Sequence, residues 1–354
     1  MYAKNEEDLI ILSSIKEIKD SVKKRLVFGG GEESAEEKRR FLIKTLSDGV
    51  YNIIKEKFND EKYRKSIIDG LESKGVKCVT YLSESYPDSL KNIDSPPLIL
   101  YCKGNTSLLK TNCFSVVGSR RSTANALALC KKISGELTEA FTVVSGLADG
   151  ADSSALEGAL PSGKVISVLA SGFDNIYPPS NLSLAEKVAK SGLLISEYPP
   201  HMRALKYNFP VRNRIIAGLS RGVLVVSAGS KSGALITADY ALEYGKDVFA
   251  FPYPPNAFSG EGCNALIKNG AYLTENILDI FAAFGLDLKR RQKRVSLSDE
   301  EKELFEEIKK VEIAFLPQVA ERLQKPVYQL IPVLSSLEIK GLIVRLGGNR
   351  YSAV

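Results

Sequence analysis

The chain has 354 residues, of which 44% are hydrophobic and 25% charged, and a formal net charge of +6. This length and balance are typical of a soluble protein of two or three domains, and the mild positive charge is compatible with nucleic acid. No apolar run approaches the roughly 20 residues of a membrane-spanning helix, and the acidic N-terminal stretch lacks the charge pattern of a signal peptide. We therefore expect a cytoplasmic protein with no membrane partner.

Histidine and cysteine usage excludes several kinds of site. His201 is the only histidine, which excludes a multi-histidine metal site and any catalytic group that needs two histidines. It lies in a proline-rich loop, where we expect it to face solvent. The five cysteines are dispersed without metal or redox spacing, which predicts reduced thiols.

Residues 1–75 are predicted to form a small helical domain. Apolar residues recur three and four positions apart, with charges between them, in two stretches separated by the loop Gly29-Gly30-Gly31. Ser34 and Glu37 resemble a capping box for the second stretch. Lys and Arg alternate with Glu throughout, which favours a solvated helical face over a nucleic-acid patch.

Residues 76–288 are predicted to form the main domain. Two short strands, Val76–Tyr81 and Pro97–Tyr101, lead into an alternation of strands and helices. The expected strands are Phe114–Val117, Thr142–Ser145, Val165–Ala170, Leu193–Ile195, Val223–Val226 and Val248–Phe251. The expected helices between them include Asn125–Ala140, Leu182–Lys190 and Leu235–Tyr244. This alternation predicts an α/β fold with a doubly wound, mainly parallel sheet covered on both faces.

The C-terminal part is predicted to be a separate domain behind a basic linker, residues 289–298, which contains the run Lys289–Arg294. Ser298 or Asp299 is expected to cap the helix that follows. Residues 299–354 show three helical patterns and a hairpin centred on Gly347-Gly348-Asn349. The helical patterns cover Lys302–Lys310, Leu316–Gln324 and Val327–Lys340. Three helices and a hairpin predict a winged-helix domain.

Small polar residues follow the predicted parallel strands, at the edge where such sheets bind ligands. The loop Ser227–Gly233 runs into a helix N-terminus, which exposes backbone N–H groups and the positive end of the helix dipole. Between the fourth and fifth strands lies a concentration of cations with aromatic residues: Arg203, Lys206, Tyr207, Phe209, Arg212 and Arg214. Cations, a stacking ring and an anion-receiving loop together indicate a phosphodiester ligand.

Several of these residues have two interpretations. Arg120 and its neighbour Arg121 end the first strand of the main alternation, where a ligand contact is favoured over an accidental surface position. One of Arg212 and Arg214 is expected to bond backbone carbonyls instead of ligand. Phe209, expected on a loop with Lys206, is either a platform for bases or an anchor into the core.

The carboxylates near the same edge are Asp149, Asp152, Glu197 and Asp239. Asp149 and Asp152 are predicted to be a turn residue and a helix N-cap, not a catalytic pair. The chain contains neither the G-x-G-x-x-G of a dinucleotide fold nor a P-loop, so we expect no cofactor and no enzymatic activity. Two rival hypotheses stay open: a nucleotide-acting hydrolase on a Rossmann-like fold, and a winged-helix regulator that binds duplex DNA.

Several motifs occur together in one order: Tyr86-Pro87, Pro96–Gly104, Gly118-Ser119-Arg120, Ser145–Asp152, Tyr177-Pro178, Ser196–Pro199, Phe209–Leu219 and Ser232–Ala238. In this arrangement the chain resembles the DprA/Smf family of bacterial DNA-processing proteins over about residues 80–285. The segment Ser336–Ile343 is similar to the winged-helix tail of that family. Two positions depart from the family pattern: Leu156 replaces a usual histidine, and Tyr253 replaces a usual glycine.

The resemblance implies an extended Rossmann-like domain that forms a homodimer and binds single-stranded DNA. It also implies delivery of that DNA to the recombinase RecA in natural transformation, without enzymatic activity. In the family, residues at the positions of Arg120, Lys206 and Phe209 contact DNA. With the neighbouring loops, the predicted DNA-binding set is Gly118, Ser119, Arg120, Arg121, Lys206, Phe209, Arg212, Asn213, Arg214, Ser230, Lys231, Ser232, Gly233 and Thr237.

Overall fold

The computed structural model describes residues 5–15, 18–28, 44, 48–286 and 297–353. The predicted capping box at Ser34 and the basic run Lys289–Arg294 lie outside the described residues. The chain splits into two compact units. The first contains Met1–Thr123 and Cys130–Asp279, and the second contains Ala124–Leu129 and Ile280–Val354. No helix in the described part of the chain is long and apolar enough to cross a membrane.

A nine-stranded sheet organises the first unit, in the order β1-β2-β6-β5-β4-β3-β7-β8-β9. Its strands are β1 (Lys77–Thr80), β2 (Ile99–Gly104), β3 (Cys113–Val117), β4 (Thr142–Ser145), β5 (Val165–Leu169), β6 (Leu193–Ser196), β7 (Ser220–Val225), β8 (Asp247–Ala250) and β9 (Tyr272–Leu273). The strands from β6 across to β9 pair in parallel, whereas β2 is antiparallel to both of its neighbours. The predicted α/β fold with a mainly parallel sheet is confirmed.

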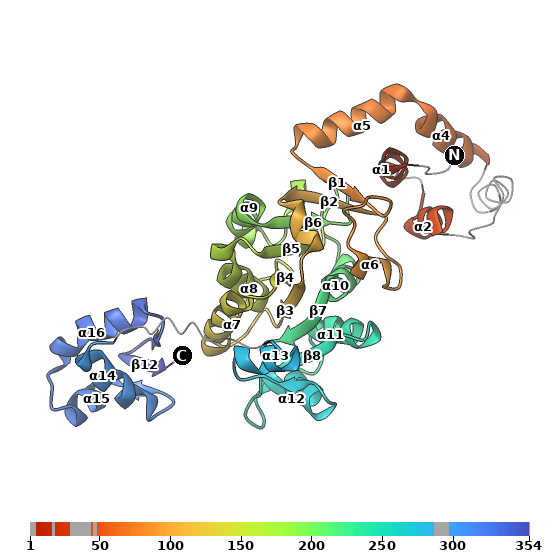
Figure 1. Cartoon of the computed structure of the whole chain (residues 1–354). Coiled ribbons are helices and arrows are strands. Elements are labelled where there is room, and N and C mark those ends of the chain that lie inside the picture. Colours follow the sequence, from red (N-terminus) through yellow and green to blue (C-terminus); the bar gives the residue numbers. More distant parts are fainter. Residues whose placement is uncertain (1–4, 16–17, 29–43, 45–47, 287–296, 354) are drawn as a thin grey trace. The chain divides into compact units, whose positions relative to one another are not determined.

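Helices cover both faces of the sheet (Figure 1). Helices α8 (Ala151–Ala159) and α9 (Leu182–Ser191) pack on one face, and α10 (Asn208–Leu219) and α11 (Gly233–Glu243) on the other. The remaining helices of the alternation are α6 (Asp88–Lys91), α7 (Ala124–Leu137), α12 (Glu261–Lys268) and α13 (Ile277–Ala283). Because helices cover both faces, the central strands β3, β4, β5 and β6 are buried along their whole length. This burial explains why their sequences are short, mainly apolar runs.

Two local predictions are wrong. Phe209 is not in a loop, because α10 already begins at Asn208. Pro210 obscures this helix in the sequence, but proline is tolerated in a first helical turn, where its missing N–H has no intrahelical partner. Asp152 is not an N-cap, because Gly150 occupies that position of α8 with a φ of +84°. A Cβ at Gly150 would lie 2.6 Å from the Ser119 carbonyl oxygen, so only glycine fits there.

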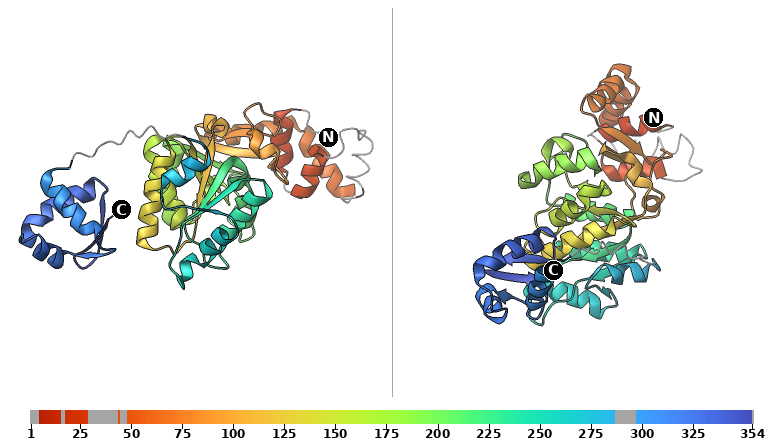
Figure 2. Two further views of the ribbon diagram at one scale, coloured as in Figure 1. Left: turned by 60° about the horizontal axis from the view of Figure 1, so that its bottom comes forward. Right: turned by 60° about the vertical axis from the view of Figure 1, so that its left-hand side comes forward.

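The described N-terminal residues form the helices α1 (Glu6–Ser14), α2 (Asp20–Phe28), α4 (Asp48–Asn59) and α5 (Glu61–Ser73). Their shared core contains Ile11, Leu12, Ile15, Ile18, Val22 and Phe58. Helix α1 packs against β1 and β2, so the helices lie at this edge of the sheet in each view (Figures 1 and 2). Glu6 strengthens the contact by accepting a 2.5 Å hydrogen bond from the Ser83 hydroxyl.

In the second unit, helices α14 (Asp299–Lys309), α15 (Leu316–Arg322) and α16 (Val327–Ile339) accompany a three-stranded sheet. Its strands are β10 (Ala314–Phe315), β11 (Ile343–Leu346) and β12 (Arg350–Ala353), and β11 and β12 form the predicted antiparallel hairpin. Helix α14 begins with a complete capping box between Ser298 and Glu301, which confirms Ser298 as the cap.

Glu301 also accepts hydrogen bonds from Ser336 of α16 and from Lys340, which follows that helix, and these contacts predict a pH dependence of stability. Hydrogen bonds from Lys340 first, and then from Ser336 and the Ser298 backbone, lower the pKa of Glu301 from 4.5 to about 2. A depressed carboxyl pKa contributes stability that is complete above the unfolded value and is lost as pH falls through the folded value. Glu301→Gln should therefore lower the thermal midpoint of this unit at neutral pH, and should change it much less near pH 2. The exposed Glu300→Gln is the matched control, and an equal pH profile for both variants would contradict the assignment.

Candidate functional site

The order of the strands brings two loops together at one edge of the sheet. From β3 the chain passes outward through β4, β5 and β6, and it then returns to place β7 on the other side of β3. At such a reversal the loops that follow the two central strands diverge to opposite faces and leave a crevice, where open α/β sheets bind ligands. Here a cavity of about 600 Å³ lies between the loop after β3 and the loop after β7.

Backbone hydrogen bonds hold these two loops together. The Ser119 N–H donates to the Ser227 carbonyl oxygen at 2.9 Å, and the hydroxyls of Ser122 and Ser227 are hydrogen-bonded to each other. Gly118 lets the loops approach, since a Cβ there would lie 2.7 Å from that of Ala151 and 3.1 Å from the Ser227 nitrogen. The loop after β3 is thereby fixed, and its side chains Arg120 and Arg121 are left exposed at the cavity.

Helix α10 contributes an aromatic ring to the same cavity. Phe209 lies in the first turn and is half-buried. The Arg120 guanidinium lies 5.6 Å from the centre of the Phe209 ring, and Tyr177 meets the ring edge to face with the centroids 5.7 Å apart. These two neighbours hold the ring at the cavity wall, which favours a platform over an anchor in the core.

Two buried residues of opposite charge, Arg212 and Asp152, line the cavity. Each side chain is almost wholly buried, and the Arg212 guanidinium also donates a hydrogen bond to the Val168 carbonyl oxygen. Burial raises the pKa of Asp152, and the nearby Arg212 opposes that shift. Burial likewise lowers the pKa of Arg212, which Asp152 opposes. The two groups stabilise each other's charged form, so the positive charge of Arg212 is largely offset and the exposed Arg120 and Arg121 supply the net positive charge of the cavity.

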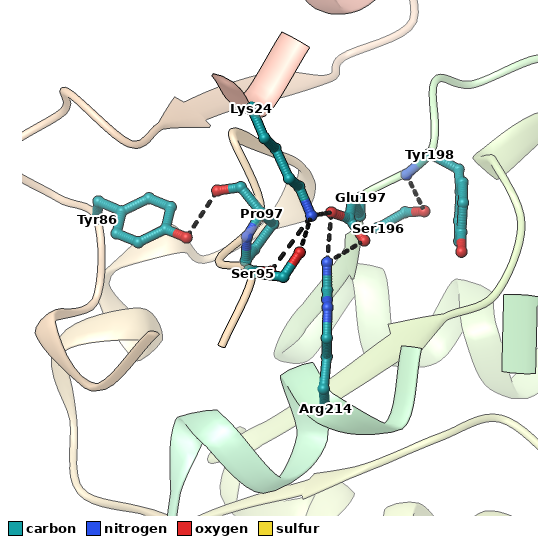
Figure 3. A network of polar contacts seen from close by, with 8 residues as sticks. All are labelled: Lys24, Tyr86, Ser95, Pro97, Ser196, Glu197, Tyr198 and Arg214. Atoms are coloured by element: carbon teal, nitrogen blue, oxygen red, sulfur yellow. Dashed lines mark hydrogen bonds and ion pairs between the residues drawn. The ribbon is translucent and has the colours of Figure 1, made fainter. Parts of the chain in front are cut away.

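Arg214 faces away from this cavity and does not line it. Its guanidinium donates to both carboxylate oxygens of Glu197, at 2.6 and 2.7 Å, and the two side chains are only 6% and 13% exposed. The Lys24 ammonium lies 3.5 Å from the same carboxylate and donates to Ser95 (Figure 3). Arg214 thus connects α10 through Glu197 to Lys24 of the N-terminal helices, and its guanidinium is occupied by this ion pair instead of lining the cavity.

The structure gathers most of the predicted set around the cavity. Those that line it are Gly118, Ser119, Arg120, Arg121, Phe209, Arg212, Asn213, Ser232, Gly233 and Thr237. Lys206, Ser230 and Lys231 do not line it but are exposed on the turns beside it. Ser232 caps α11 by accepting from the Ala234 N–H, so the predicted loop-to-helix junction is confirmed.

Sequence reasoning missed one aromatic residue of this site. Phe258 lines the cavity from the other side and is 76% exposed, which is unusual for a phenylalanine. It lies in a single 3-10 turn at Phe258–Gly260, beyond β8, far in sequence from the motifs that mark the site. The high exposure of the Phe258 side chain marks it as a site residue, and exposure cannot be read from the sequence.

The two departures from the family pattern have local explanations. Leu156 is completely buried in α8, so an apolar side chain suits its surroundings. The Tyr253 hydroxyl donates a 2.9 Å hydrogen bond to the Val226 carbonyl oxygen, where the chain leaves β7. Burial raises the pKa of Tyr253 to about 12, so its hydroxyl stays protonated and able to donate. Tyr253 therefore supports the loop that forms one wall of the cavity.

The charged groups that line the cavity are three arginines and one carboxylate: Arg120, Arg121, Arg212 and Asp152. Hydroxyls and the N-terminus of α11 add hydrogen-bond donors. Within the described ranges, no cluster of three or more histidine, cysteine or acidic side chains could hold a metal ion. Asp152 is buried, accepts a hydrogen bond from the Ala148 N–H and does not have a second carboxylate beside it among the lining residues. The arrangement suits binding of a polyanion with unpaired bases.

Comparisons with known proteins point in the same direction. Residues 77–285 match the family model of DNA recombination-mediator protein A. Protein Smf of Synechocystis is 42% identical over 232 residues, which cover 63% of this chain and 58% of the relative. The DNA processing protein DprA of Streptococcus pneumoniae is 42% identical over 204 residues, 57% of this chain and 72% of that protein.

Two solved structures share this fold. The X-ray structure of DNA processing protein A from Streptococcus pneumoniae has a TM-score of 0.58 at 35% identity and covers 69% of this chain and 90% of that one. A structure of DNA processing protein A from Helicobacter pylori, which concerns the single-stranded DNA binding mode of that protein, has a TM-score of 0.54 at 31% identity. It covers 59% of this chain and 95% of that one.

Proposed function

Because the chain belongs to the DNA recombination-mediator protein A family, we propose that it binds single-stranded DNA at the cavity between the β3 and β7 loops. The observation that carries the proposal is the pairing of exposed Arg120 with the Phe209 ring at the carboxyl edge of the sheet. A cation beside an aromatic face suits a strand whose phosphates need neutralising and whose bases need a surface to stack on. Lys206 extends the positive surface along the turn before α10.

We further propose that the protein acts as a homodimer and delivers the bound strand to the recombinase RecA in natural transformation. Support comes from the family, which is that of a DNA recombination mediator. The second unit, with three helices and a hairpin, is proposed to be a winged-helix domain. Its first helix begins with Asp299, Glu300 and Glu301, which favours a protein contact over duplex DNA.

A fluorescence-anisotropy titration separates this function from its rivals. A labelled single strand should bind more tightly than duplex of the same length, and free nucleotides should compete only weakly. The reason is that stacking on Phe209 needs unpaired bases, while several phosphates must be held at once. Saturable binding of a free nucleotide with turnover would favour the hydrolase hypothesis, and a preference for duplex would favour the regulator.

Removal of residues 289–354 tests where the strand binds. The truncated chain should keep its affinity for single-stranded DNA within about threefold, because every residue proposed to contact DNA lies before residue 260. The full chain is the control, and circular dichroism shows whether the sheet unit stays folded. If the truncated chain is folded but has lost most of its affinity, the DNA-binding site lies in residues 289–354 and not at the sheet edge.

A further inference from the structure

A second cavity, of about 510 Å³, lies where the N-terminal helices meet the segment that leads into α10. Ser13, Ser14 and Lys23 line one side, and Tyr198 and Arg203 line the other. Its volume is within the range of about 300–1,000 Å³ that ligand sites occupy. The charge pattern of the N-terminal helices predicts a solvated helical face, and nothing in the sequence places these helices beside a cavity.

The charges around this cavity repeat the balance of the first one. Three cations, Lys23, Lys24 and Arg203, and one carboxylate, Glu197, line it. Lys23 is buried and donates to the Ser13 carbonyl oxygen, and Lys24 pairs with Glu197, so the exposed Arg203 is the cation open to a ligand. Glu197 is paired with the buried Arg214, and Arg212 favours the charged form of Asp152, so the carboxylate of each cavity is compensated by an arginine. The net field inside is positive, which suits a phosphate group.

The wall of the second cavity is ordered and leads directly to the first. The Met202 carbonyl oxygen accepts from the Gly172 N–H at 2.8 Å, and the His201 carbonyl accepts from the Asn175 side chain at 3.0 Å. These bonds leave the Arg203 side chain exposed at the cavity. From Arg203 the chain reaches Phe209 within six residues, no more than about 22 Å. Exposed Lys206 lies between them.

We propose that the second cavity takes further nucleotides of the same single strand, so that the N-terminal helices form part of the DNA path. The inference rests on the proposed function of the first cavity. Arg203 holds a phosphate, and Tyr198 offers a ring for one base. Roughly six stacked nucleotides at about 3.4 Å each cover about 20 Å, close to the largest distance that the chain from Arg203 to Phe209 can span, so one longer strand can occupy both cavities.

The test compares oligothymidylates of about 3 and about 20 nucleotides. At about 3.4 Å per nucleotide the shorter strand extends about 10 Å, which keeps it within one cavity, whereas the longer strand can occupy both. Arg203→Ala should weaken the longer strand about fivefold, which corresponds to about 1 kcal/mol, and reduce its salt slope by about 0.7. The shorter strand should bind as to the unchanged protein. Arg203→Lys should restore the slope, and Lys187→Ala, which removes an exposed cation of α9, should change neither strand.

Each alternative result has a distinct meaning. If Arg203→Ala leaves both lengths unchanged while Arg120→Ala weakens both, the second cavity is not on the DNA path and the proposed function stands. If Arg203→Ala weakens both lengths equally, Arg203 belongs to the first site and the inference is overturned. If thymidine monophosphate displaces the longer strand to the affinity of the shorter one, the cavity binds free nucleotide instead. If neither oligonucleotide binds the unchanged protein, the proposed function fails as well.

Discussion

Replacement of Glu197 by alanine should lower the free energy of unfolding of the sheet unit by about 3–5 kcal/mol. The substitution leaves the Arg214 guanidinium buried without its partner, and one of its nitrogens already lacks a hydrogen-bond acceptor among the described residues. It also removes the ion pair between Glu197 and Lys24, which connects the N-terminal helices to the sheet unit. Urea unfolding followed by circular dichroism measures the loss.

A matched control comes from an exposed pair in the same unit. Lys131 and Glu157 lie 2.9 Å apart with side chains 56% and 49% exposed, so Glu157→Ala should cost less than about 1 kcal/mol. The double variant Glu197→Met with Arg214→Met should recover much of the loss, because no buried charge is left unpaired. Equal effects of Glu197→Ala and Glu157→Ala would show that burial of the first pair has no energetic consequence.

Phe209→Ala should weaken single-stranded DNA binding by about 1–3 kcal/mol, roughly 5- to 150-fold. The loss follows from the missing surface on which a base stacks, next to the Arg120 guanidinium. Anisotropy titration at one salt concentration measures it, after circular dichroism has shown that the variant is folded.

Two further substitutions separate stacking from packing at this position. Phe209→Tyr keeps the ring and should bind nearly as well as the unchanged protein. Phe209→Leu keeps apolar contact with Tyr177 but has no aromatic face, and it should bind as weakly as the alanine variant. Full affinity of Phe209→Leu would make Phe209 a packing residue and remove stacking from the mechanism.

Local patterns predicted the strands and the ligand edge well, because buried parallel strands are short apolar runs with small polar residues at their ends. The predicted strand Thr142–Ser145 coincides with β4, and the others shift by a few residues at their ends. Helix α10 escaped prediction because its first turn places Pro210 among cations and aromatic residues, which looks like a loop.

What the sequence could not show depends on contacts between distant segments. The role of Arg214 depends on Glu197, which β6 places beside α10, and on Lys24 from a helix far earlier in the chain. Whether Arg212 or Arg214 faces the cavity is decided by helical rotation, and this requires the helix to be recognised first. The pairing of β7 with β3, which creates the crevice, is a choice of strand order that no local pattern encodes.

The salt dependence of single-stranded DNA binding tests the central claim most directly. Arg120→Ala and Lys206→Ala should each weaken binding and reduce the slope of log affinity against log salt by about 0.7, since each removes one phosphate contact and its counterion release. Phe209→Ala should weaken binding with the slope nearly unchanged, and Lys187→Ala on α9 serves as the control for a cation outside the site. If all three site variants stay folded and match the unchanged protein in affinity and slope, single-stranded DNA does not bind at this edge of the sheet.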